Sequence, residues 1–220
     1  MLPSNRHDWK MKRNPYDRIA RIYDAFSGVL GGTYLDSKYL FLEKIDAGDK
    51  VLYLGGGTGA NLPAIVERIG EEGKLVYMEL SREMIKKAKS KTPASVLHRV
   101  EFLQQGDFSK IPNEKYDKIL TQYFLDILSD EDIHRLFQNI NLRVDKRSQW
   151  IFLDFFNVKA RRVVLSTMIG FFRLFVGNPR TNLPQYADFF ELYGWRMKEV
   201  KSVKGGFIQA WSLERGGTER

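Results

Sequence analysis

Hydrophobic and polar positions follow two different periods along the chain. Short apolar runs, typical of buried strands, occur at 50–54, 74–80, 100–104, 116–123 and 149–155. Longer stretches with apolar residues three or four positions apart lie between them, at 60–69, 82–91 and 129–142, and predict helices. Strands that alternate with helices favour a parallel sheet covered by helices on both faces.

The two ends of the chain depart from this alternation. Helices are predicted over 14–30 and 33–46 before the first strand, and another helix is predicted over 182–193. Two final strands, at 195–204 and 207–213, are joined by Gly205-Gly206, a hairpin signal. The expected fold is therefore α/β: a doubly wound, mostly parallel seven-stranded sheet with a C-terminal antiparallel hairpin strand. We expect an N-terminal helical cap over 1–47, one domain over 48–214 and a short tail over 215–220.

Composition narrows the class of protein. The chain has 220 residues and no cysteine, which excludes disulfides, thiolate metal sites and a cysteine nucleophile. Its three histidines, His7, His98 and His134, are scattered, so no metal site is expected. No run of eighteen apolar residues predicts a membrane span, and the first residues lack the apolar segment of a secretory signal. These features favour a cytoplasmic protein.

The net charge of +8 favours anionic partners such as nucleic acid, phospholipid or acidic metabolites. The basic residues are spread over several predicted helices, however, and no platform of aromatic and basic residues stands out. A nucleic-acid partner is therefore disfavoured, although an RNA-binding protein or RNA methyltransferase is kept as an alternative.

The most informative stretch is a glycine-rich loop at 55–59, which follows the first strand and opens a helix. Gly55, Gly57 and Ala60 satisfy the G-x-G-x-x-G/A pattern of dinucleotide sites, where the backbone approaches a ligand closely. Glycines can also be required there for tight packing alone. Glu79 ends the second strand, where a carboxylate can bind a ribose diol or can stabilise the start of the next helix. Two cofactor classes, nicotinamide dinucleotides and S-adenosylmethionine, are compatible with this pattern.

The third strand discriminates between these classes, because it ends in Asp107 and Phe108. The carboxylate can accept a hydrogen bond from an adenine amino group, and the ring can line the base pocket. Here the chain resembles the class I S-adenosylmethionine-dependent methyltransferases, over roughly residues 15–213. The resemblance is carried by LGGGTG at 54–59, Glu79, GDF at 106–108, YDKIL at 116–120 and the final hairpin. An NAD(P)-dependent oxidoreductase is the alternative, disfavoured by the closing hairpin and by the lack of a suitably placed Tyr-x-x-x-Lys pair.

The resemblance implies a set of cofactor contacts. The loop would hold the methionine part of S-adenosylmethionine, Glu79 the ribose hydroxyls, Asp107 with Phe108 the adenine, and Gln122 the sulfonium side. The full set of expected cofactor-binding residues is Gly55, Gly56, Gly57, Gly59, Glu79, Leu80, Asp107, Phe108, Gln122 and Tyr23. One position departs from the family, which often has an acid two residues before the first glycine. Tyr53 stands there, which puts the usual polar support of the methionine ammonium in doubt.

The N-terminal segment resembles a narrower group. Residues 16–24, YDRIARIYD, are similar to the YDxxAxxYD lead-in of the methyltransferases of ubiquinone and menaquinone biosynthesis and their small-molecule relatives. In that group the helix covers the cofactor, which would place Tyr23 near the cofactor carboxylate. Tyr16 and Tyr23 could equally form an aromatic stripe that packs the cap.

The chemistry of methyl transfer demands little of the protein beyond holding the acceptor in line with the sulfonium. No catalytic base can be assigned; Asp126, Asp154 and Tyr23 are the candidates, and His134 is expected to be a surface or packing residue. The stretch 121–126, TQYFLD, contains no Asn-Pro-Pro-Tyr-type loop. We therefore expect S-adenosylmethionine-dependent methyl transfer to a small, partly apolar or lipophilic acceptor.

A basic and apolar segment at 158–180 lies between the fifth strand and the last helix. It carries Lys159, Arg161, Arg162, Arg173 and Arg180 and no acid. The segment is expected to be a substrate lid, either an ordinary one or one that touches an anionic membrane surface. The acceptor's identity and the oligomeric state are left open.

Overall fold

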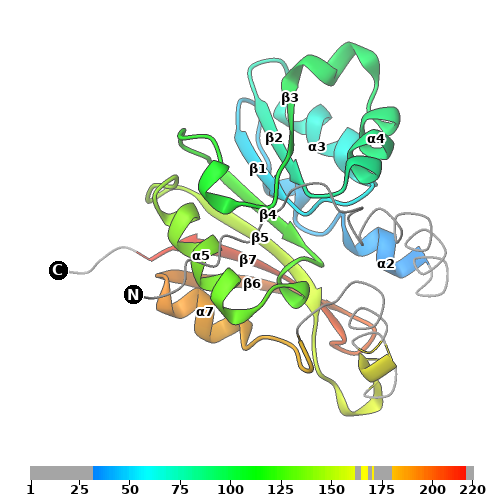
Figure 1. Ribbon diagram of the computed structural model, residues 1–220, viewed down its shortest axis with the longest axis vertical. Helices are drawn as coiled ribbons and strands as arrows, with labels where there is room; N and C mark the ends of the chain where they lie inside the picture. Colours follow the sequence, from blue (N-terminus) through cyan, green and yellow to red (C-terminus); the bar gives the residue numbers. More distant parts are fainter. Residues whose placement is uncertain (1–31, 162–164, 168–169, 171–179, 217–220) are drawn as a thin grey trace, which may run out of the picture.

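The computed structural model describes residues 32–161, 165–167, 170 and 180–216. The predicted helix over 14–30, most of the segment 162–180 and the end of the tail lie outside these residues. The centre of the structure is one seven-stranded sheet with strand order β3-β2-β1-β4-β5-β7-β6 (Figure 1). None of the described helices is long and apolar enough to cross a membrane.

Five strands of the sheet are parallel, and the last two run antiparallel to their neighbours. The parallel strands are β1 (Lys50–Leu54), β2 (Lys74–Glu79), β3 (Val100–Gln104), β4 (Lys118–Gln122) and β5 (Gln149–Phe155). The closing hairpin consists of β6 (Trp195–Val203) and β7 (Ile208–Arg215). The predicted fold class is confirmed. The strand order reverses between β1 and β4, and in such sheets ligands bind at the carboxyl edge beside this reversal.

The described helices connect these strands. The α-helices are α2 (Gly32–Ser37), α3 (Leu62–Ile69), α4 (Arg82–Lys91), α5 (Asp130–Asn141) and α7 (Tyr186–Leu192). Short 3₁₀ helices are η1 (Leu42–Lys44), η2 (Ala94–Arg99), η3 (Phe108–Lys110), η4 (Leu125–Ile127) and η5 (Lys159–Arg161). The predicted caps of α4 and α5 are confirmed, because Ser81 and Ser129 each accept a hydrogen bond from a backbone N–H of the first turn.

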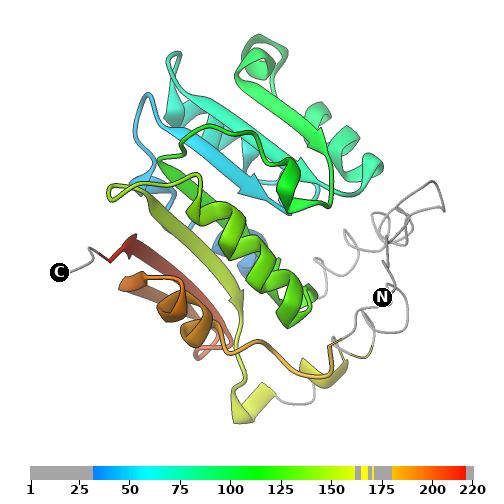
Figure 2. The same ribbon diagram turned by 60° about the vertical axis from the view of Figure 1, so that its left-hand side comes forward.

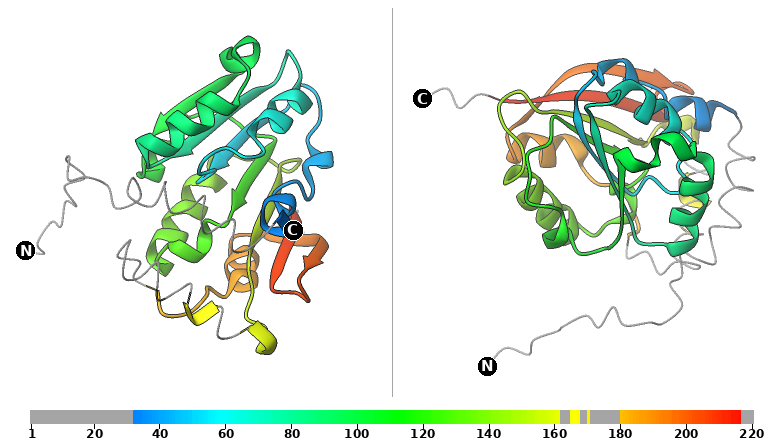
Figure 3. Two further views of the ribbon diagram at one scale, coloured as in Figure 1. Left: turned by 90° about the vertical axis from the view of Figure 1, so that its right-hand side faces the viewer. Right: turned by 90° about the horizontal axis from the view of Figure 1, so that it is seen from above.

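Each face of the sheet has its own apolar core. Residues of α2, α3 and α4 pack on the face that carries Tyr53 and Tyr77, whereas α5 and α7 pack on the face that carries Leu52 and Leu54. Figure 2 shows α5 lying along this second face, and the twist of the sheet is visible in the views of Figure 3. Successive side chains of a strand point to opposite faces, so a sheet covered on both faces needs the continuous apolar runs seen in the sequence.

Two predicted boundaries are wrong. The predicted helix over 33–46 ends at Ser37, and Phe41 adopts a left-handed conformation with φ 65°. The Lys38 carbonyl accepts hydrogen bonds from the side chains of Asn61 and Gln122 instead of receiving a helical N–H. The strand predicted over 116–123 ends one residue early, because Tyr123 also has a positive φ, 55°. Tertiary contacts therefore override the helical and strand patterns at both places.

Smaller differences concern elements near the edges. The short helix η2 was not expected, and the helix predicted over 182–193 begins at Tyr186. The division into a cap over 1–47 and a domain over 48–214 stays a prediction, because residues 1–31 lie outside the described part.

The second core yields a prediction about stability. Phe137 of α5 is fully buried and stacks on Trp150 with ring centroids 4.7 Å apart. Phe137→Ala should lower the free energy of unfolding by about 3–5 kcal/mol, because it removes a buried ring and leaves a cavity. Leu142→Ala, at a side chain that is 70% exposed just after the same helix, is the control and should change it by less than about 0.5 kcal/mol. Urea denaturation measures both, and equal effects would contradict the assignment of Phe137 to the core.

Candidate functional site

The loop after β1 is held by two side chains of β2. The Tyr77 hydroxyl donates to the Gly57 carbonyl at 2.8 Å, and the Gly57 N–H donates to Oε2 of Glu79 at 3.1 Å. Tyr77 and Glu79 lie two positions apart on one strand, so their side chains point to the same face of the sheet. Together they bind the carbonyl and the N–H of Gly57. The loop is therefore fixed at the carboxyl edge, next to the reversal of strand order.

The glycines of this loop serve two purposes. A Cβ at Gly56 would lie 2.4 Å from the Tyr77 ring, so this position is glycine because of protein packing. Gly57 has φ 65°, and among the described residues a Cβ there would meet nothing nearer than the Met84 sulfur at 3.8 Å. Its conformation favours glycine while the space beside it is open. Packing thus explains part of the glycine pattern, as the sequence allowed, and Gly57 offers a backbone that a ligand can approach.

Glu79 is 7% exposed and keeps hydrogen-bonding capacity. Its Oε1 accepts from the N–H of Ser81 at 2.9 Å, in addition to the bond from Gly57. Burial raises the pKa of Glu79, and the hydrogen bonds from backbone N–H groups oppose that shift. The backbone N–H of Leu80 also donates to this carboxylate, so of its about four lone-pair positions at least one stays open to a ribose hydroxyl. It fits the ribose role expected for it, and it also binds the start of α4.

A buried polar network lies on the other side of the loop. The Tyr53 hydroxyl donates to Oε1 of Gln122 at 2.8 Å and also lies 3.1 Å from Oδ1 of Asn61. The side-chain amides of Asn61 and Gln122 both donate to the Lys38 carbonyl, at 2.8 and 3.0 Å. Tyr53 therefore replaces the family's acid with a neutral polar group that ties the sheet to the segment after α2. The amide of Gln122, expected at the sulfonium side, is engaged within this network.

Lys38 itself is a buried cation that the sequence did not single out. Its side chain is 3% exposed, and its ammonium lies 5.8 Å from the centre of the Tyr34 ring. Burial lowers the pKa of Lys38 to about 8, attraction to Glu79 opposes that shift, and Lys91 adds to it. Within the described part of the chain, no carboxylate forms an ion pair with this ammonium. A buried ammonium without an anionic partner fits a ligand that carries a carboxylate. Lys38 lies in what the pattern predicted as an ordinary helix, so no sequence signal marked it.

The expected adenine residues lie at the ends of β2 and β3. Asp107 is exposed and accepts a hydrogen bond from the N–H of Ser109 at 2.9 Å, and its hydrogen bonds to Ser109 lower its pKa. Phe108 is buried, with its ring edge-on to Phe124. Leu80 lies against Gly106, where a Cβ would be 3.1 Å from its side chain. These residues are close to Glu79 along the same edge, and their adenine contacts stay predictions.

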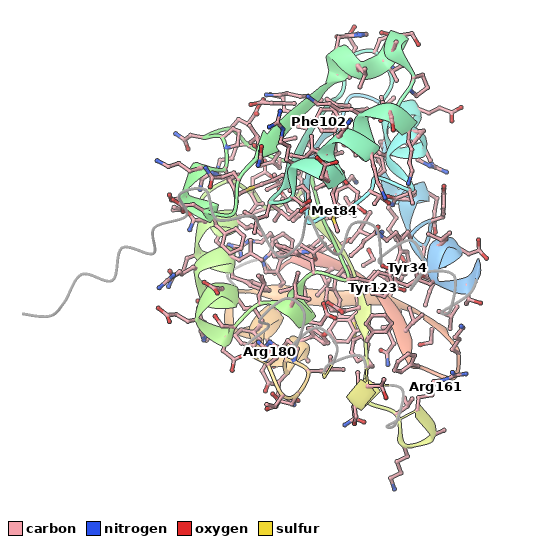
Figure 4. The ribbon with its side chains drawn as sticks, turned by 45° about the vertical axis from the view of Figure 1, so that its right-hand side comes forward. Tyr34, Met84, Phe102, Tyr123, Arg161 and Arg180 are labelled. Carbon is pink, nitrogen blue, oxygen red and sulfur yellow. The ribbon has the colours of Figure 1, made fainter. Side chains whose placement is uncertain are left out.

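The carboxyl ends of β4 and β5 bring the two predicted carboxylates together. The Asp126 N–H donates to Oδ2 of Asp154 at 3.3 Å. Nearby, the Tyr123 ring packs against the Tyr34 ring, with centroids 4.4 Å apart (Figure 4), and against the Phe155 ring, with centroids 4.6 Å apart. A buried tyrosine with positive φ is strained, and such strain is common at functional sites.

Of the two further candidates, only His134 lies in the described part of the chain. Tyr23, the remaining catalytic and cofactor candidate, lies outside the described residues. His134 packs edge-on against Phe189 at 5.0 Å and lies 3.0 Å from the Tyr193 hydroxyl, as expected for a packing residue. The described residues contain no group of three or more His, Cys, Asp or Glu side chains that could hold a metal ion.

The chain matches a family of known proteins in sequence. Residues 51–146 match the model of a methyltransferase domain. The ubiquinone/menaquinone biosynthesis C-methyltransferase UbiE of Teredinibacter turnerae is 27% identical over 123 residues, which cover 54% of this chain and 49% of that protein. The chain thus spans about half the length of the curated relatives it first matches.

Solved structures agree with the observed fold. The mitomycin 7-O-methyltransferase MmcR superimposes with a TM-score of 0.69 at 17% identity, over 92% of this chain and 61% of that one. The complex of DhpI with SAH gives a TM-score of 0.63 at 19% identity, over 92% and 94% of the two chains. At these identities the structural likeness concerns the fold.

The buried ammonium of Lys38 leads to a prediction about stability and pH. Below pH 8 the folded and unfolded chains both carry the proton, so the full cost of burying the charge is present. Lys38→Met should therefore raise the free energy of unfolding at pH 7 by about 1–3 kcal/mol. The gain should shrink as the pH rises from about 8 to 10.5, where the folded chain loses the proton first and wild type gains stability.

Chemical denaturation between pH 7 and 10 measures this effect. Lys86→Met, at an exposed lysine of α4, is the matched control and should change stability by less than about 0.5 kcal/mol at any of these pH values. A Lys38→Met protein that is less stable than wild type at pH 7 would show that the ammonium has a stabilising partner.

Proposed function

We propose that this chain, a class I S-adenosylmethionine-dependent methyltransferase, transfers a methyl group to a small acceptor molecule. The observation that carries the proposal is the Gly57 backbone, held by Tyr77 and Glu79 at the reversal of strand order with open space beside it. The methyltransferase-domain match over 51–146 covers this loop and supports the same activity.

The described residues provide a group for each part of the cofactor. Glu79 would accept hydrogen bonds from the ribose diol, and Asp107 with Phe108 and Leu80 would surround the adenine. Lys38 would bind the carboxylate of the methionine part, since it is a buried cation near Glu79. The network of Tyr53, Asn61 and Gln122 would keep the segment that carries Lys38 against the loop.

The residues of the chain have a limited task in the reaction. When bound, S-adenosylmethionine supplies a methyl group on a positively charged sulfur, which is already a good leaving group. The protein contributes chiefly by orientation, because it holds the acceptor's nucleophilic atom near ~3 Å and in line with the bond that breaks. Tyr123 has a strained backbone, and its ring packs against the rings of Tyr34 and Phe155 at the end of β4. These contacts would hold the acceptor side of the site in one position.

The nature of the acceptor is part of the proposal. UbiE and the mitomycin 7-O-methyltransferase are named for quinone and mitomycin chemistry, which supports a small and partly apolar acceptor for this chain. Contact of the segment 158–180 with an anionic membrane stays a prediction, since Arg162 and Arg173 lie outside the described residues. Sedimentation with anionic vesicles at low salt would test it.

Glu79→Ala should weaken binding of S-adenosylhomocysteine by about tenfold to a hundredfold, the worth of about 1.5–3 kcal/mol of hydrogen bonds to a charged group. Asp107→Ala should weaken it less, because it removes one contact to an amino group. Titration calorimetry measures both, with Glu83→Ala, an exposed acid of the first turn of α4, as control. Unchanged affinity in folded Glu79→Ala would leave Glu79 as a helix-start residue only, and heat from NAD but not from the sulfonium cofactor would overturn the proposed function.

Lys38→Met should weaken binding of S-adenosylhomocysteine by about tenfold or more and leave the affinity for methylthioadenosine within about twofold. Methylthioadenosine keeps the adenine, ribose and sulfur but lacks the amino-acid part, so it cannot contact the ammonium. Calorimetry with both ligands on wild type and Lys38→Met measures this difference. Parallel losses for the two ligands would show that Lys38 acts on the fold of the site and not on the carboxylate.

A further inference from the structure

A cluster of three polar side chains lies beyond the cofactor loop, at the carboxyl ends of β4 and β5. Asp126 comes from η4, Asp154 from the end of β5 and Tyr186 from the start of α7. Asp154 is fully buried; its Oδ1 accepts from the N–H of Phe155 at 2.9 Å, and its Oδ2 accepts from the N–H of Asp126. Three separate elements therefore converge on one point.

Two polar atoms of this cluster are short of hydrogen bonds within the described part of the chain. Oδ1 of Asp126 is buried without a partner there, and the buried hydroxyl of Tyr186 has only the neighbouring Asp154 carboxyl, at a geometry short of a standard hydrogen bond. Tyr186 is 4% exposed, and the negative charges of Asp154 and Asp126 raise its pKa in addition to burial, so its hydroxyl faces the two carboxyls. A buried polar group without a full hydrogen bond lowers the stability of the fold. A ligand that donates to Asp126 and accepts from Tyr186 would remove this cost.

The charges around the cluster keep one carboxyl protonated near neutral pH. The groups that face it are Asp126, Asp154, Tyr186 and Arg180. Burial raises the pKa of Asp126 to about 7, and attraction to Arg180 opposes that shift. Burial and repulsion by Asp126 raise the pKa of Asp154 well above its usual range. The Arg180 guanidinium (Figure 4) is bound to the Leu128 carbonyl and to Asp130, so it offsets the repulsion only in part.

The cluster is connected to the cofactor loop through Phe124. A Cβ at Gly55 would lie 2.2 Å from the Phe124 ring, so the segment between β4 and η4 packs directly on the loop. Asp126 follows Phe124 by two residues. Asp126 therefore lies in the segment that borders the glycine loop.

We propose that Asp126, supported by Asp154 and Tyr186, is the group that accepts a proton from a hydroxyl of the methyl acceptor. This inference rests on the proposed function. A hydroxyl fits both atoms, since it can donate to Oδ1 of Asp126 and accept from the hydroxyl of Tyr186. The nitrogen of an aniline is a poor acceptor because its lone pair is delocalised into the ring, and its N–H is far less acidic than a phenol hydroxyl. The acceptor class is thus a molecule with a weakly acidic hydroxyl, of which a phenol is the simplest example.

The step balances without a further reactant. The hydroxyl proton passes to the Asp126 carboxylate, and an oxygen lone pair forms the new O–CH₃ bond. The S–CH₃ bond breaks, and its electron pair stays on sulfur. The products are a methyl ether and S-adenosylhomocysteine, and the proton leaves Asp126 for water when the product departs.

The test uses the full chain and a series of para-substituted phenols of graded acidity, each with the matching aniline. Methyl-labelled S-adenosylmethionine and mass spectrometry of the products report the rate. We expect methylation of phenols and not of anilines, with kcat/KM for wild type rising through a pH of about 7, above which Asp126 is ionised. Asp126→Asn should lower kcat about a hundredfold or more, most for the least acidic phenols, and should flatten the pH profile.

Controls separate this inference from folding and from the proposed function. Tyr186→Phe should lower kcat less than Asp126→Asn does, and Glu131→Gln, at an exposed acid of α5 that pairs with Arg135, should keep the wild-type rate and profile. S-adenosylhomocysteine should bind all variants within about twofold of wild type.

Three results overturn the assignment: an unchanged pH profile and rate in Asp126→Asn, anilines methylated as well as phenols, or no phenol methylated by a protein that binds S-adenosylmethionine. Absence of cofactor binding altogether would instead overturn the proposed function.

Discussion

The whole site depends on the way β2 holds the loop after β1. Tyr77 and Glu79 bind the carbonyl and the N–H of Gly57, and this is possible because the two strands are parallel neighbours in register. A parallel pair presents both carboxyl ends at one edge, so a side chain at the end of one strand reaches the loop that follows the other. The same contact orients Glu79, the group expected to bind the ribose. The sheet's register therefore sets the geometry of the cofactor site.

Several residues of the candidate site have a burial or a backbone conformation that lowers the stability of the fold. Lys38 is a buried ammonium near Glu79 without an ion pair in the described chain, and Tyr123 is strained. Oδ1 of Asp126 has no partner among the described residues, and the Tyr186 hydroxyl has only the Asp154 carboxyl beside it. All four residues lie at the carboxyl edge, close to β1, β4 and β5. Such local costs at one edge are expected where a protein binds ligands, because the ligand supplies the missing partners.

The division between the two halves of the edge follows from the strand order. Glu79 and Asp107 end the strand segments on one side of the reversal, and Asp126 and Asp154 follow β4 and β5 on the other. The residues proposed to contact the cofactor thus lie on the β1–β2–β3 side, and the proposed proton acceptor lies on the β4–β5 side. Lys38 and the network of Tyr53, Asn61 and Gln122 lie at the junction. In this proposal the fold places the leaving group and the methyl acceptor on opposite sides of the reversal of strand order.

The sequence by itself determined the fold class and the place of the glycine loop, and it indicated the resemblance to methyltransferases. Buried parallel strands need continuous apolar runs, and helices need a 3.6-residue period. A strand–glycine–helix turn is likewise a local feature. All three can therefore be recognised from residues that are neighbours in the sequence. Ser81 and Ser129 marked helix starts for the same reason. Asp126 and Asp154 could be named as candidates because each follows a strand.

Only the tertiary structure decided what those residues meet. The helix predicted over 33–46 breaks after Ser37 because Asn61 and Gln122, distant in sequence, capture the Lys38 carbonyl, and this break buries the Lys38 ammonium in the site. Tyr186 joins Asp126 and Asp154 because α7 packs across β5. A side chain's burial and pKa depend on groups that the fold brings from far along the chain, and no local pattern contains that information.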